Sequence, residues 1–129
     1  MSRTRVTRLT GVYHADGGVR GELTYVVGKL RGRAHCGLCD ITHSPVRRKK
    51  EWDAYVDGLP VPFDTVHLND RSAAVRELTE GETPCVVAHT EVGLSILVPA
   101  SELDGSGGDV GAFSQVLASA LDSHGLTLG

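Results

Sequence analysis

The amino-acid sequence predicts one α/β domain spanning residues 1–129. A length of 129 residues is enough for one hydrophobic core and short for two. Hydrophobic residues make up 40% of the chain and charged residues 22%, which is typical of a folded globular domain. Stretches with strand-like patterns and stretches with helical spacing of apolar residues follow one another, without an internal repeat. These observations together predict a sheet flanked by helices.

The first half of the chain predicts one strand and two helices. The strand consists of β-branched and apolar residues and runs into the turn-forming stretch 14–18. Apolar residues at helical spacing follow, and Gly32 stands where a C-cap is expected. Ser44 before Pro45 then favours a helix start. The predicted elements are a strand over 5–13, a helix over 19–31, and a helix from Pro45 to 58–60.

The second half predicts three strands, a short helix and a closing helix. The last two strands are separated by a short turn over 90–93 and should pair antiparallel. Glycines make 104–108 a flexible connector, after which Asp109 is a suitable N-cap. The predicted elements are a strand over 62–68, a helix over 71–78, strands over 83–89 and 94–98, and a helix from Asp109 to about Gly125. The sheet is then mixed and has about four strands.

The charge balance argues against several classes of partner. The net charge of -3 provides no general attraction to nucleic acid or anionic lipid. The basic run 47–50 is interpreted as a solvated helix face. With one tryptophan, three tyrosines and two phenylalanines in the chain, no aromatic residues interleave with basic ones, so nucleic-acid binding is not expected. No secretory leader and no membrane-spanning segment are visible, so we expect a cytoplasmic protein. The partner is not identified by the sequence, and a homodimer is left open.

Two cysteines and a histidine form the most informative motif. Cys36, Cys39 and His43 can supply two thiolates and one imidazole to a tetrahedral Zn²⁺ site or a thiolate-rich Cu(I) site. Such a site needs a fourth ligand. The candidates are His35, Asp40, Cys85, His67 and His89.

The same cysteines allow two other interpretations. In a thiol-disulfide oxidoreductase Cys36 would be the nucleophile and Cys39 the resolving thiol. Alternatively, both are small buried packing residues. Because the chain has three cysteines and is expected in a reducing compartment, a structural disulfide framework is not predicted.

A second candidate site lies just after the first predicted strand. Tyr13, His14 and Asp16 stand at its carboxyl end, the usual place for ligands in open α/β folds. The glycines that follow would let backbone N–H groups approach an anion, and Cys85 is expected beside the same edge. The alternative is a simple turn in which Asp16 caps the following helix.

The order of elements resembles the thioredoxin-like fold over roughly residues 5–125. That resemblance implies a three-layer sandwich, with a strand-helix-strand half followed by an antiparallel hairpin and a closing helix. Thr83-Pro84 also resembles the proline that these proteins hold in cis beside their active site. Thioredoxins carry Cys-x-x-Cys directly after the first strand, however, whereas this chain has residues 13–18 there. Their mechanism is therefore not transferred to Cys36 and Cys39.

The motif itself resembles two further groups. Uncharacterised bacterial proteins have a similar Cys-x-Leu-Cys-Asp-Ile-Thr-His stretch, and some small thiol-disulfide oxidoreductases share the Cys-x-Leu-Cys core. Neither resemblance implies an assigned reaction. The sequence therefore predicts a metal-binding thioredoxin-like domain, with an oxidoreductase or a non-catalytic binding module as the alternatives.

Overall fold

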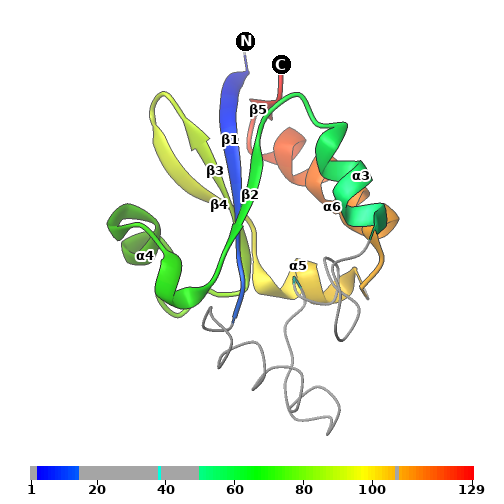
Figure 1. Ribbon diagram of the computed structural model, residues 1–129. Coiled ribbons are helices and arrows are strands. Elements are labelled where there is room, and N and C mark those ends of the chain that lie inside the picture. The colour runs from blue at the N-terminus through cyan, green and yellow to red at the C-terminus, as the bar shows by residue number, and fades with distance from the viewer. Residues whose placement is uncertain (1–2, 15–37, 39–49, 107) are drawn as a thin grey trace, which may run out of the picture.

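The computed structural model describes residues 3–14, 38, 50–106 and 108–129, which form a mixed five-stranded sheet with helices on both faces (Figure 1). Strand β1 pairs in parallel with β2 and antiparallel with β3, and β3 pairs antiparallel with β4. The order is β2-β1-β3-β4, and β5 pairs in parallel with the start of β1. The strands are β1 (Thr4–Val12), β2 (Phe63–Val66), β3 (Cys85–Thr90), β4 (Gly93–Val98) and β5 (Leu126–Thr127).

Helices α3, α5 and α6 lie on one side of the sheet and α4 on the other (Figure 1). A single turn of 3-10 helix, η1, links β2 to α4. The helices are α3 (Lys50–Asp57), η1 (Leu68–Asp70), α4 (Ala73–Thr79), α5 (Ala100–Gly105) and α6 (Val110–Ser123).

The alternation of side chains along the strands divides the core into two clusters. On the α3 and α6 side, Trp52 is fully buried, with its ring centroid 5.1 Å from that of Phe63 and 5.6 Å from that of Phe113. On the α4 side a smaller cluster contains Val75 and Cys85. Because successive residues of a strand point to opposite faces, neighbours in β1 and β3 contribute to different clusters.

Most of the predicted elements that fall on described residues are confirmed. The strands differ from their predicted bounds by a few residues, and the antiparallel hairpin of β3 and β4 is present. The end of the second predicted helix is α3, whereas its start and the predicted helix over 19–31 lie outside the described residues. Helix α6 is capped by Asp109, whose carboxylate accepts from Ala112 N at 2.8 Å.

Three elements were not predicted: η1, α5 and β5. The prediction of a flexible connector over 104–108 is wrong at its start, because helix α5 extends to Gly105. Its only fully buried side chain is Leu103, so the segment shows no apolar periodicity in the sequence. Strand β5 has two residues, and its backbone pairs with β1 across the fold. Helix α5 and strand β5 depend on contacts with distant parts of the chain.

Among the described helices, none has the length and apolar character needed to cross a membrane.

Candidate functional site

Most of the predicted ligand residues lie in parts of the chain that the structure does not describe. Within the described ranges, no group of three or more His, Cys, Asp or Glu side chains could hold a metal ion. The described residues that bear on the site are Tyr13, His14, Leu38, His67, Cys85 and His89. The predicted residues outside the described ranges are Asp16, His35, Cys36, Cys39, Asp40 and His43.

The carboxyl ends of the parallel strands β1 and β2 meet at the edge where β3 begins. Val12 at the end of β1 lies opposite Val66 of β2 and Cys85 of β3. The next residue, Tyr13, donates its backbone N–H to Val66 O at 2.9 Å, and its side chain is buried. This register brings Tyr13, His14 and Cys85 to one edge of the sheet.

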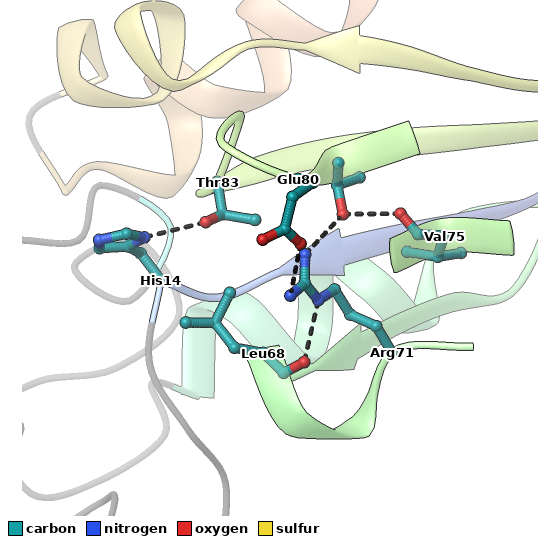
Figure 2. A network of polar contacts seen from close by, with 7 residues as sticks. His14, Leu68, Arg71, Val75, Glu80 and Thr83 are labelled. Carbon is teal, nitrogen blue, oxygen red and sulfur yellow. Dashed lines mark hydrogen bonds and ion pairs between the residues drawn. The ribbon is translucent and has the colours of Figure 1, made fainter. Parts of the chain in front are cut away.

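His14 is held beside the segment that leads into β3. Its Nδ1 lies 2.9 Å from Thr83 Oγ1, and the imidazole tautomer decides which group donates (Figure 2). The peptide bond between Thr83 and Pro84 is cis, as the fold resemblance implied. His14 is exposed, so this edge presents an imidazole to the surface.

Cys85 lies at the same edge but is fully buried on the α4 side. Burial raises the pKa of its thiol from 9.0 to about 11, with the charge of Glu82 adding to the rise and that of Arg71 opposing it. At neutral pH the thiol is protonated. The reactive form of cysteine is the thiolate, both as a nucleophile and as a metal ligand, so the protonated Cys85 is suited to neither role.

Arg71 connects η1 to the end of α4 (Figure 2). Its side chain is only 7% exposed, and its Nε donates to Leu68 O at 2.9 Å. Its other nitrogens donate to Thr79 Oγ1 at 3.1 Å and to Glu80 Oε2 at 3.4 Å, while Thr79 Oγ1 donates to Val75 O at 2.7 Å. The buried guanidinium is thus hydrogen-bonded on several sides. It links η1 to the C-terminal end of α4.

Leu38, the second residue between the two cysteines of the motif, is fully buried in the core on the α3 and α6 side. It packs where β1 has a glycine: a Cβ atom on Gly11 would lie 3.0 Å from Leu38 Cδ2. The same Cβ would lie 3.2 Å from Phe63 Cε1 and 3.5 Å from Thr65 Cγ2. Leu38 therefore packs against the centre of the sheet, over Gly11 of β1.

His67 belongs to the same face as Leu38. Its ring centroid is 5.0 Å from that of Tyr13, a member of the core cluster that contains Leu38. Its Nδ1 lies 3.2 Å from Asp70 Oδ2. A carboxylate that holds one imidazole nitrogen fixes the tautomer in which the other can bind a metal. Of the two described histidines that were predicted as possible ligands, His67 is the one on the face of Leu38.

His89 lies on the opposite face, with Cys85. Its Nε2 is 2.8 Å from Thr10 Oγ1. Thr10 precedes Gly11 in β1, so its side chain points to the face opposite Leu38. Burial lowers the pKa of His89, nearby Arg8 lowers it further, and Asp64 opposes them. His89 is therefore neutral at pH 7, and the sheet separates it from Leu38.

A groove of about 680 Å³ lies away from this edge, between β4 and α6. Its lining combines apolar and polar side chains, among them Ile96, Val116, Ser119 and His124. None of these residues was predicted as part of a site.

The sequence interpretation missed Leu38, Gly11 and Arg71. Leu38 stands alone between cysteines, so no periodic pattern marks it as a core residue. Arg71 follows Asn69 and Asp70, which reads as a surface stretch. A glycine inside an apolar strand was the one available signal, because such a glycine often marks a close approach of another part of the chain.

Comparison with protein-family models, with curated proteins and with solved structures found no match for this chain.

Proposed function

We propose that this protein is a thioredoxin-like domain that binds a soft or borderline metal ion, zinc or copper(I), through Cys36, Cys39 and His43. The spacing supplies two thiolates and an imidazole, which suit both ions. The observation that carries the proposal is the complete burial of Leu38 between the two cysteines. Binding sites are most effective when packing holds their supporting residues in place, and Leu38 provides such an anchor.

The strand arrangement supports the thioredoxin-like part of the proposal. The parallel strands β1 and β2 precede an antiparallel hairpin of β3 and β4, and α6 follows, which is the order the resemblance implies. This chain still differs from thioredoxins directly after the first strand, where it has Tyr13 and His14 in place of Cys-x-x-Cys. The edge that carries chemistry in thioredoxins therefore presents an imidazole in this chain.

The two faces of the sheet separate the candidates for the fourth ligand. His67 is on the face of Leu38, whereas Cys85 and His89 are on the other. Cys85 would also have to lose a proton held with a raised pKa. We therefore propose His67 from the described part of the chain, with His35 as the alternative within the motif.

The test is elemental analysis of protein purified without chelator, paired with a count of free thiols. We expect near-stoichiometric zinc or copper in the wild type and its loss in Cys39→Ser, because the variant lacks one of the two thiolates that favour a soft or borderline ion. Cys85→Ser is the matched control and should keep its metal. Metal that persists in Cys39→Ser, or wild-type protein that takes up neither ion, would contradict the proposal.

A thiol-disulfide oxidoreductase is the second candidate function. The strand order resembles a fold used by such enzymes, and the protonated, buried Cys85 leaves Cys36 and Cys39 as the available pair. The same experiment distinguishes the two functions. Wild-type protein without metal, but with one reversible disulfide that disappears in Cys36→Ser, would favour redox chemistry. If Cys36 and Cys39 can both be replaced by serine without loss of fold, metal or redox activity, the non-catalytic binding module is the remaining function.

A further inference from the structure

Strand β4 forms one edge of the described sheet. In the order β2-β1-β3-β4 it pairs with β3 on one side, and no described strand pairs with its other side. Alternate residues of an antiparallel strand direct their N–H and C=O groups to the same neighbour, so about half of these groups in β4 point away from β3. A sheet edge of this kind can accept a further strand.

The side chains of β4 do not prevent such pairing. Proteins usually protect an edge strand with charged residues or proline, and residues 93–98 contain neither. The ladder with β3 is regular from Gly93 to Ile96, before the irregularity near the end of β4. Leu94 and Ile96 are only partly buried against the cluster on the α4 side, so an added strand would cover apolar surface.

The groove between β4 and α6 carries opposite chemistry at its two ends. Glu102 lies in α5, which follows the C-terminal end of β4, whereas His124 follows the C-terminal end of α6. Helix α6 leads to β5, which pairs with the start of β1, at the same end of the sheet as the hairpin of β3 and β4 (Figure 1). The carboxylate and the imidazole therefore lie toward opposite ends of β4. Between them, the wall that α6 contributes includes several small residues: Ala112, Ser119, Ala120 and Ser123.

We propose that β4 is a dimerisation edge, which pairs antiparallel with β4 of a second copy of this chain. Such pairing has a twofold axis perpendicular to the sheet, so the two sheets join into one and both α6 helices lie on the same side. With the axis at Ser95, Leu94 of each copy lies opposite Ile96 of the other, which gives two apolar cross-strand pairs. The same rotation brings Glu102 of each copy toward His124 of the other. This self-complementarity favours a second copy over a foreign strand.

The experiment is sedimentation velocity under reducing conditions, over a range of protein concentrations. An interface built on one short strand lies at the small end of the usual range, so we expect dimers at concentrations on the order of 10–100 μM. Leu94→Lys should weaken dimerisation about tenfold or more, because lysine blocks an edge and the twofold axis counts the substitution twice. Leu78→Lys is the matched control, since Leu78 is partly buried against the same cluster but belongs to α4. It should leave dimerisation unchanged.

The charge pair provides an independent test at exposed positions, where substitution leaves the core intact. Glu102→Lys should weaken the dimer about threefold, and the double variant Glu102→Lys with His124→Glu should restore it. If Leu94→Lys does not fold, this comparison decides. A dimer that Glu102→Lys does not weaken, or that the double variant does not restore, would overturn the inference.

The inference does not depend on the proposed metal-binding function, and a chelator separates the two. Dimers held by β4 should persist in chelator, whereas dimers bridged by a metal ion would dissociate and so overturn the edge pairing. A dimer unchanged by Leu94→Lys, or weakened equally by Leu78→Lys, would also overturn it. Wild-type protein that stays monomeric at every concentration would overturn it as well and leave the edge to a strand of another protein.

Discussion

Burial gives Cys85 and Arg71 properties that their residue types alone do not indicate. Cys85 is enclosed among Val12, Val75 and Val87, and the apolar surroundings keep its thiol protonated. The guanidinium of Arg71 is 7% exposed, and carbonyl, hydroxyl and carboxylate oxygens accept its hydrogen bonds there. At this scale, the neighbours decide whether a titratable side chain can react.

The raised pKa of Cys85 predicts a loss of stability at alkaline pH. Between pH 9 and pH 11 the unfolded chain releases this proton while the folded protein retains it, so the free energy of unfolding falls as pH rises. A shift of two pKa units corresponds to at most about 3 kcal/mol. Urea unfolding of wild type and Cys85→Ala at several pH values measures the difference. An equal pH dependence in the two proteins would contradict this prediction.

At the scale of elements, local capping and distant packing contribute differently to each helix. Helix α6 has both: Asp109 caps its first turn, and Phe113 and Leu117 bury one face. Helix α5 has no side-chain cap and buries only Leu103 fully. Helix α6 was therefore predictable from its own residues, whereas α5 depends on where Leu103 packs.

Removing the α6 cap should destabilise the protein by about 1 kcal/mol. In Asp109→Ala the backbone N–H of Ala112 loses its acceptor, and the negative charge at the positive end of the helix dipole is also lost. Chemical denaturation of this variant measures the cost. Asp109→Asn keeps an acceptor oxygen and should lose less, so an equal loss in both variants would point to the charge and not the cap.

At the scale of the whole molecule, an aromatic cluster joins α3, β2 and α6. The rings of Trp52, Tyr55, Phe63 and Phe113 lie within 5.1–6.2 Å of their partners, centroid to centroid. This cluster holds the helical layer against the sheet on the face that receives Leu38. The packing of Leu38 therefore depends on three separate elements.

Truncation of Phe113 should destabilise the fold by about 3–5 kcal/mol, because it opens a cavity beside three other rings. Urea unfolding followed by the fluorescence of the single tryptophan, Trp52, measures this loss. Phe113→Leu retains much of the volume and should cost less than about 1.5 kcal/mol. A cost below that value for Phe113→Ala would mean that the cluster is not the centre of the core.

The sequence alone predicted much of the described fold and little of the described site. Alternating and periodic apolar residues identified β1 to β4 and α6, since these elements bury a regular face. The carboxyl edge with Tyr13, His14 and Cys85 followed from element order. The burial of Arg71 and the packing of Leu38 over Gly11 could not be predicted, because each depends on residues far along the chain.

The sequence by itself determined the residue types available for chemistry, the Cys-x-x-Cys spacing and the periodicity of its regular elements. These are local properties, set by covalent order and by the alternation of side chains. Only the tertiary structure decided that Leu38 packs over Gly11, that His67 shares its face, and that Cys85 and His89 lie behind the sheet. Strand pairing and packing set those relations, and they join residues that the sequence keeps apart.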